Sequence, residues 1–186
     1  AIVIGVVSSE GDTGFVRLIL GDSYVNMTQE NIKNDDPLAV YKQMNGVDMF
    51  MGITFNNIRV SFYAFMAGLL LSVGTILLLL YNGIMLGTFH HLFYTQDLLF
   101  KSLSIVWIHG TLEISSIIIA GAAGLILGNS ILFPKTYSRR QSFLISAKDG
   151  VKIIIGLIPL FIVAGFLESF VTRFTQMPIF INLTII

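Results

Sequence analysis

Two residues whose types could support chemistry, His109 and Glu113, lie inside an apolar stretch that reads VWIHGTLEISSIIIAGAAGLILG. A carboxylate within hydrocarbon costs about 2.5 kcal/mol or more, so it normally faces other helices or a wet cavity and has a partner. The spacing of four residues puts both side chains on one helix face if the helix begins by His109. The pair therefore predicts a polar site inside a bundle of membrane helices.

One interpretation of this site is a structural cluster of ionisable groups that pins the helices together near the outer surface of the membrane. Its expected members are Arg59, His109, Glu113, Glu168 and Arg173. In this interpretation Glu113 pairs with Arg59 or Arg173. The alternatives are an ion, proton or substrate pathway, and a metal site completed by His90 or His91. We predict no metal and no cofactor, because one histidine and one glutamate are too few ligands and no HExxH pattern is present.

The composition places the chain among membrane proteins. Of its 186 residues 54% are hydrophobic and only 12% are charged, whereas a soluble domain has about 25% charged residues. The formal net charge of zero indicates no nucleic-acid partner, and the absence of cysteine excludes disulfides and thiolate catalysis. We also predict no enzymatic activity, because the sequence contains no GxSxG motif, no P-loop and no intramembrane pair of aspartates.

Hydropathy divides the chain into four segments. Residues 1–7 are apolar but too short to span a bilayer, and we interpret them as the end of a transmembrane helix whose earlier part is absent. Residues 8–52 form an acidic loop, and residues 53–173 form a transmembrane bundle. Residues 174–186 are a short C-terminal tail.

Three apolar runs within the bundle are each long enough for one crossing: 56–80, 110–133 and 151–171. His109 and Gly110 are expected to form the turn before the second of these runs. Orientation follows from lysine and arginine, which gather in residues 135–152 and are scarce in residues 8–52. The positive-inside rule makes the first segment cytoplasmic and the second extracytoplasmic.

Loops on opposite sides require an odd number of crossings between them, so a further crossing must lie within residues 83–108. Because this segment is polar in its middle, we predict a broken helix there. The expected fold class is therefore all-α: a polytopic transmembrane helical bundle with about five crossings, of which the first is truncated.

Small residues in the apolar runs predict close helix packing. Gly83 and Gly87 form one GxxxG motif, and Gly124 and Gly128 form another. We expect these motifs to pack helices within the chain, with a homodimer face as the alternative. The residues expected at helix ends and packing positions are Asn56, Asn57, Asn82, Gly83, Gly87, Gly110, Gly121, Gly124 and Gly128.

Three stretches resemble the stage II sporulation protein M family: NNIRVSFYAFMAGLLLSVGT, YNGIMLG and HGTLEISSIIIAGAAGLILG. The family shares an Asn-Asn-x-Arg start of a helix, a following Asn-Gly-x-x-x-Gly, and a His-Gly-x-x-Glu that leads into an Ala/Gly-rich helix. The resemblance covers residues 56 to about 173. The matching positions are Asn56, Asn57, Arg59, Asn82, Gly83, Gly87, His109, Gly110, Glu113, Gly121 and Gly124.

The resemblance implies an integral membrane protein of about five helices. Members in spore formers scaffold extracytoplasmic peptidoglycan hydrolases during engulfment, and others resemble parts of gene clusters with MoxR-type AAA+ ATPases. We therefore expect a non-enzymatic scaffold or assembly subunit of a prokaryotic envelope complex in the cytoplasmic (inner) membrane. Its expected partners are membrane lipids and other envelope proteins. The alternative is a transporter or channel-like protein that uses the polar cluster around Glu113.

Overall fold

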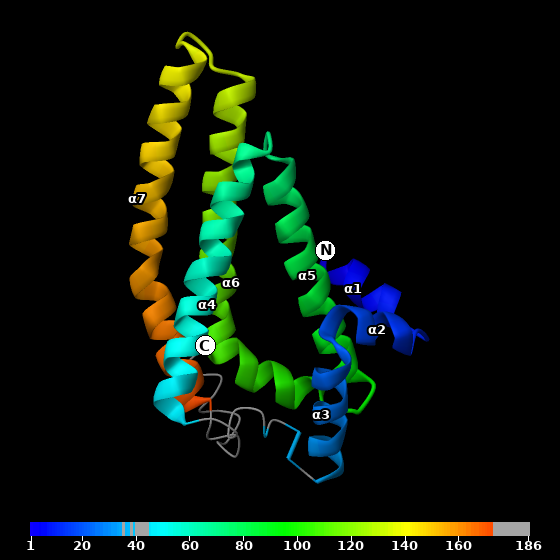
Figure 1. Ribbon diagram of the computed structural model, residues 1–186. Coiled ribbons are helices and arrows are strands. Elements are labelled where there is room, and N and C mark those ends of the chain that lie inside the picture. The colour runs from blue at the N-terminus through cyan, green and yellow to red at the C-terminus, as the bar shows by residue number, and fades with distance from the viewer. Residues whose placement is uncertain (35, 38, 40–44, 173–186) are drawn as a thin grey trace. The chain divides into compact units, whose positions relative to one another are not determined.

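A computed structural model describes residues 1–34, 36–37, 39 and 45–172 of the chain (Figure 1). Within these ranges the regular elements are helices, which confirms the expected all-α class. The predicted C-terminal tail, residues 174–186, lies outside the described residues, as does part of the predicted acidic loop.

The chain divides into two compact units. Unit 1 comprises Ala1–Phe50, Leu80–His109 and Phe166–Ile186, and unit 2 comprises Met51–Leu79 and Gly110–Gly165. Three short helices open unit 1: α1 (Ile2–Ser9), α2 (Thr13–Leu20) and α3 (Asp22–Lys33). The longer helices are α4 (Gly46–Met66), α5 (Val73–Tyr94), α6 (Leu99–Leu132) and α7 (Arg139–Phe166).

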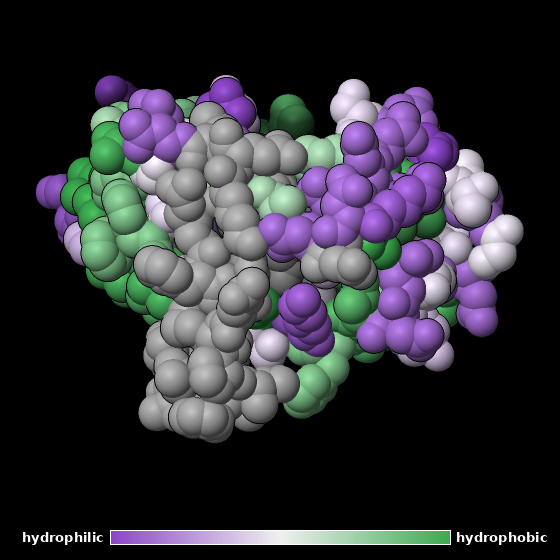
Figure 2. Space-filling view, turned by 90° about the horizontal axis from the view of Figure 1, so that it is seen from below, coloured by the Kyte–Doolittle hydropathy of each residue, from purple (hydrophilic) through white to green (hydrophobic). Residues whose placement is uncertain are grey.

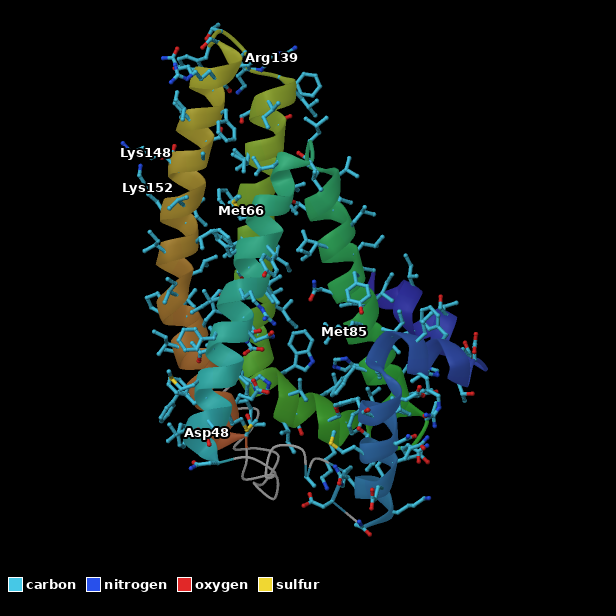
Figure 3. All side chains as sticks on the ribbon, viewed as in Figure 1. Asp48, Met66, Met85, Arg139, Lys148 and Lys152 are labelled. Atoms are coloured by element: carbon cyan, nitrogen blue, oxygen red, sulfur yellow. The ribbon has the colours of Figure 1, made fainter. Side chains whose placement is uncertain are left out.

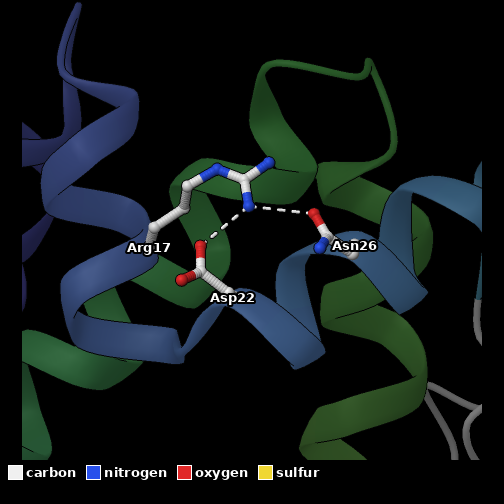
Figure 4. A network of polar contacts seen from close by, with 3 residues as sticks. All are labelled: Arg17, Asp22 and Asn26. Carbon is white, nitrogen blue, oxygen red and sulfur yellow. Dashed lines mark hydrogen bonds and ion pairs between the residues drawn. The ribbon is translucent and has the colours of Figure 1, made fainter.

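Local signals define the short helices of unit 1. Asp12 caps α2 by accepting a hydrogen bond from the Phe15 amide at 3.0 Å. Gly21 then adopts a φ of 86°, which lets α3 begin directly after α2. The Arg17 guanidinium donates to Asp22 and Asn26 at 2.9 Å and ties the two helices together (Figure 4).

One face of α3 packs inward and the other carries hydrophilic side chains. Val25 joins Val16 and Leu92 in a small core cluster of unit 1. Figure 2 shows hydrophilic side chains gathered over α2 and α3. The exposed polar residues of α3 are Asp22, Ser23, Asn26, Gln29, Glu30 and Lys33.

Unit 2 is built around the second half of α6, with α4 and α7 alongside it (Figure 1). Phe65 of α4, Leu127 of α6 and Phe161 of α7 are each at most 2% exposed and belong to one apolar core cluster. The other buried members are Ala120, Ala123, Ile154 and Leu157. Small residues on α6 let the larger side chains of its neighbours reach the centre.

Three helical segments of the described chain are long and apolar enough to cross a membrane: Val73–Tyr94, Leu99–Leu132 and Arg139–Val171. Their outward-facing side chains are largely apolar, as expected for contact with lipid. Examples are Leu77, Ile118 and Ile155, which are 57–60% exposed. The expectation of membrane-spanning helices is thus confirmed.

The prediction of one crossing over residues 56–80 was wrong. Helix α4 ends at Met66, and a 3₁₀ turn, η2 (Ala67–Leu69), leads into a reversal before α5. Leu71 and Ser72 have φ angles of 52° and 70° there, a conformation that non-glycine residues rarely adopt. The Ser72 hydroxyl donates to the Leu125 carbonyl at 3.0 Å, so α6 helps to stabilise the reversal.

The path of residues 83–108 is only partly as predicted. A break does occur at Thr95–Asp97, where Asp97 has a φ of 57°. However, α5 continues through Asn82 and Gly83, and α6 continues through His109 and Gly110. The expected turn at His109 is therefore absent, and His109 and Glu113 lie four residues apart within one continuous helix.

Candidate functional site

In unit 2, the carboxylate of Glu113 lies against the side chain of Asn57. Glu113 is on α6 and Asn57 is on α4, where it is 9% exposed. The Asn57 amide donates to Glu113 Oε1 at 2.5 Å. A hydrogen bond to an ionised carboxylate contributes about 1.5–3 kcal/mol, so this contact fixes α4 against α6.

The two helices run parallel in a constant register along this contact. Asn57 faces Glu113, Gly68 faces Gly124, and Ser72 faces Gly128. In each pair the two residue numbers differ by 56.

Polar side chains that are buried or, for Glu113, partly buried follow this contact over two turns of α4 and one turn of α6. We call the set the α4–α6 seam, and its members are Thr54, Asn57, Ser61, Glu113 and Ser116. Spacings of three and four residues keep them on one face of each helix. The hydroxyls of Thr54, Ser61 and Ser116 are 7%, 0% and 0% exposed as residues and have no hydrogen-bond partner.

The buried hydroxyls of Ser102 and Ser169 are likewise without a hydrogen-bond partner, whereas other buried hydroxyls of the protein are paired. Ser9, Ser104 and Ser130 are also buried, but each donates to a backbone carbonyl three or four residues earlier. This is the usual way to satisfy a serine in an apolar helix. A buried polar group without a partner is uncommon and costly, so the seam requires an explanation.

The arginine expected opposite Glu113 takes a different position. Arg59 is exposed and donates at 3.0 Å to Oδ1 of Asn56, the residue before Asn57. The expected pairing of Glu113 with Arg59 is therefore replaced by its hydrogen bond to Asn57. Arg173, the other expected partner, lies outside the described residues.

In unit 1, His109 meets Glu168 and Thr172. Its Nδ1 lies 3.1 Å from Thr172 Oγ1, and its Nε2 lies 3.7 Å from Glu168 Oε1. Both partners follow the end of α7, where the chain forms a π-helix, η3 (Leu167–Val171). The Thr172 amide donates to the Leu167 carbonyl, five residues back, at 2.8 Å. Such π-turns occur frequently at functional sites.

This arrangement holds an imidazole between a hydroxyl and a carboxylate. His109 is only 3% exposed, so its orientation is fixed by packing and by these two contacts. A histidine beside a carboxylate can hold or pass on a proton. The structure thus brings together two members of the expected polar cluster, His109 and Glu168, and the convergence of all five remains a prediction.

Of the two histidines considered for a metal site, His90 has hydrogen bonds at both ring nitrogens. His90 Nδ1 lies 2.7 Å from the Leu86 carbonyl, and Trp107 Nε1 donates to His90 Nε2 at 3.3 Å. These contacts engage both ring nitrogens and specify the neutral ring with its hydrogen on Nδ1. His91 lies on the same helix and is 7% exposed.

The glycine motifs pack against the backbone of the same chain. A Cβ on Gly87 would meet the Ile2 carbonyl of α1, and a Cβ on Gly83 would meet Ala1. A Cβ on Gly124 would lie 2.5 Å from the Ala64 carbonyl, and one on Gly121 would lie 2.6 Å from Leu79. Both GxxxG motifs are therefore used within the chain, as expected. Gly110 is buried in α6, and Asn82 is half-buried in α5.

Four residues of these contacts are not among those expected from the sequence: Thr54, Ser61, Ser116 and Thr172. The first two stand three residues before and four residues after Asn57, and Ser116 stands three residues after Glu113. Polar residues at helical spacing in apolar segments are the signal that could have found them. The π-turn that brings Thr172 to His109 has no comparable signal.

Comparison with protein families gives a match over most of the chain. Residues 1–173 match the family model described as stage II sporulation protein M (SpoIIM). This match extends beyond the resemblance seen at residues 56–173, because it includes the N-terminal helices. No curated protein and no solved structure matches the chain significantly.

Proposed function

Because the chain belongs to the stage II sporulation protein M family, we propose that it is a non-enzymatic scaffold or assembly subunit of a prokaryotic envelope complex. The observation that supports this proposal best is the contact between α6 and the reversal that joins α4 to α5. A Cβ on Gly68 or on Gly128 would overlap with backbone atoms across this contact. Backbones this close leave no room for helices to slide, which suits a rigid platform better than a moving gate.

The distribution of charge supports a two-sided platform in the cytoplasmic membrane. Arg139, Arg140, Lys148 and Lys152 are exposed along the first part of α7 (Figure 3). By the positive-inside rule this end is cytoplasmic. Along the sequence, α4, α5 and α6 come between the acidic segment 8–52 and this end of α7, and three crossings would put the acidic segment outside. Helix α4 has 21 residues, about the number that one crossing needs.

The exposed hydrophilic side chains of α3 are the proposed docking surface for an extracytoplasmic partner. Gln29 and Glu30 are exposed there, and neither is needed for the core cluster of unit 1. The resemblance to the family suggests peptidoglycan hydrolases as partners on this side and a MoxR-type AAA+ system on the other. Membrane lipids would surround the apolar faces of the spanning helices.

A transporter or channel-like function is the second candidate, and the α4–α6 seam favours it. A carboxylate inside a membrane protein is by default a candidate for an ion or proton pathway, and three hydroxyls near Glu113 have no partner. Against it stands the glycine contact between Gly68 and Gly124, which closes the seam at its end toward the reversal. A continuous pathway along the seam would have to pass through this backbone contact.

Purification in mild detergent with identification of co-purifying proteins tests the scaffold. We expect defined envelope proteins to accompany the wild type and to be lost with the double substitution Gln29→Arg and Glu30→Arg. Ile155→Leu, a change on the lipid-facing side of α7, is the matched control and should retain them. A chain that purifies alone from its native membrane would contradict the proposal.

Flux into liposomes tests the second candidate with the same preparations. The scaffold proposal expects Glu113→Gln to leave proton and ion flux at the background level of the wild type. If the wild type conducts and Glu113→Gln abolishes conduction, the transporter is the correct function.

A further inference from the structure

Three side chains that can bind a metal ion converge at one place, although they come from two distant segments of the chain. His109 and Glu113 are on α6, and Glu168 is on η3, which follows α7. One ligand atom from each of the three lies within 4.8 Å of the others: an imidazole nitrogen and two carboxylate oxygens. The boundary between the units falls between His109 and Gly110, but α6 continues through it. The helix therefore fixes Glu113 relative to His109, and the contact within unit 1 fixes Glu168.

The distance between His109 Nε2 and Glu168 Oε1 suits two ligands of one metal ion better than a direct bond between the side chains. At 3.7 Å it exceeds the range of about 2.7–3.2 Å that is usual for a hydrogen bond. Two ligands that each lie about 2.1 Å from a tetrahedral zinc ion are about 3.4 Å apart. The two side chains would thus need only a small adjustment to bind one ion.

Other atoms of the same side chains have partners that hold the ligands in place. His109 turns Nδ1 toward Thr172 Oγ1 at 3.1 Å, so that Nε2 lies on the side of Glu168. The Asn57 amide donates to Oε1 of Glu113, and an ionised carboxylate can accept this bond and bind a metal as well. Metal-binding histidines commonly donate their other ring N–H in this way, and metal-binding carboxylates are hydrogen-bonded in turn.

The three ligands together indicate the class of metal. Two ionised carboxylates carry two negative charges and a neutral imidazole carries none, so one divalent cation would neutralise the set. Imidazole together with carboxylate is a donor set of Zn²⁺ and other divalent first-row metals, whereas Mg²⁺ and Ca²⁺ prefer oxygen ligands. The prediction of no metal from the sequence counted His109 and Glu113 alone, and Glu168 supplies a third ligand.

We propose that His109 Nε2 and the carboxylates of Glu113 and Glu168 bind one divalent first-row metal ion, for which Zn²⁺ is the probe. Three protein ligands leave one position of a four-coordinate ion for water. The bound ion joins the segment that follows α7 to α6 and stabilises the folded state. Metal binding here is independent of the choice between scaffold and transporter.

Zinc analysis of the full chain tests the site, with protein that carries no histidine tag and is reconstituted in lipid nanodiscs. After treatment with EDTA, addition of ZnCl₂ and dialysis, we expect the wild type to retain equimolar zinc. Zn²⁺ should also raise the unfolding temperature in a saturable way, because a ligand of the folded state stabilises it, and MgCl₂ should do neither. Glu168→Gln should lose both effects. Thr172→Val, which removes the partner of His109 Nδ1, should weaken the apparent zinc affinity by about 10- to 100-fold.

His91→Gln is the matched control, because His91 is also a buried histidine, at 7% exposure, but lies outside the cluster. It should keep the zinc affinity of the wild type. A proton shared by the two carboxylates would hold the cluster together without metal, so a wild type that retains no zinc would overturn the proposal. Equal zinc retention by the wild type and Glu168→Gln would overturn it too.

X-ray absorption at the zinc edge of the wild type adds a criterion that holds even where a substitution prevents folding. We expect one imidazole nitrogen among oxygen ligands at about 2.0–2.2 Å. A spectrum with no imidazole, or with two or more, would assign the zinc to other residues and would contradict the proposed site.

Discussion

Each unit contains a partly buried glutamate, and the two units provide it with different partners. In unit 1, Glu168 lies 3.7 Å from His109, a side chain that can itself carry a charge. In unit 2, Glu113 accepts a hydrogen bond from Asn57, which stays neutral at every pH. Helix α6 supplies His109 to the first site and Glu113 to the second. One helix thus serves two sites of different chemistry.

The units also differ in what holds their helices together. Unit 2 has a contiguous apolar cluster of seven buried residues. It also has backbone contacts at two glycines of α6, Gly124 and Gly128, while Gly121 packs against the Leu79 side chain. In unit 1, Ser9 donates to Thr88 at 3.3 Å, and His109 meets Thr172. Tight apolar packing tolerates little change, whereas side-chain hydrogen bonds depend on particular partners, so different substitutions should damage the two units.

The largest effect is expected where unit 2 packs backbone against backbone. In Gly124→Ala the new Cβ would lie 2.5 Å from the Ala64 carbonyl, so α4 would have to move, and we expect a loss of about 3 kcal/mol. Gly156→Ala on α7 meets no atom within 4 Å and should stabilise the helix by up to about 1 kcal/mol. Unfolding in detergent micelles measures both, and equal effects would show that the backbone contact is not close.

A smaller effect is expected when Glu113 loses its partner. Asn57→Leu leaves the partly buried Glu113 carboxylate without its donor and should cost about 2 kcal/mol. Adding Glu113→Leu should recover part of this loss, because two apolar side chains replace the whole polar pair. The control is Asn56→Ala, which removes an exposed neighbour and should change the free energy of unfolding by at most about 0.5 kcal/mol. A double variant less stable than Asn57→Leu would contradict this account of the pair.

The pair in unit 1 should show a coupling of about 1 kcal/mol between His109→Leu and Glu168→Gln in a double-mutant cycle. The exposed pair of Lys152 and Asp149 is closer, at 2.8 Å, yet solvent screening should limit its coupling to about 0.5 kcal/mol or less. We therefore expect the coupling energy of these pairs to depend more on burial than on the distance between the charged atoms. If the exposed pair couples more strongly, the contact between His109 and Glu168 is merely steric.

The fold class and the features of individual helices can be predicted from the sequence, because they depend on local pattern. Long apolar runs predict spanning helices, and glycines four residues apart predict close packing, which the contacts at Gly87 and Gly124 confirm. His109 and Glu113 were also recognisable, since a histidine and a glutamate are rare inside apolar segments. Asn57 was interpreted as a helix cap, because its partner lies 56 residues away.

Features that depend on distant contacts could not be predicted. The reversal after α4 occurs in a sequence, LLLSVGT, that is almost entirely apolar and contains no proline. Leu71 and Ser72 nevertheless adopt positive φ angles, and the Ser72 hydroxyl bonds to Leu125 on α6. The turn is therefore stabilised by tertiary structure, and the hydropathy of the segment alone favours one continuous crossing.

The last prediction concerns Tyr24 on α3 and tests unit 1 alone. Its effect on stability at neutral pH should be the smallest of those given. Burial raises its pKa from 10.0 to about 12, although a hydrogen bond with Thr28 opposes the shift. The folded state therefore favours the protonated phenol. Its contribution to stability is fully present below pH 10 and is lost as the pH rises through 12.

Between these values the wild type should lose stability more steeply than Tyr24→Phe, whereas Tyr137→Phe, at an exposed site of unit 2, should keep the wild-type slope. Parallel slopes for the wild type and Tyr24→Phe would mean that α3 exposes this phenol, and that the small core of unit 1 is looser than that of unit 2.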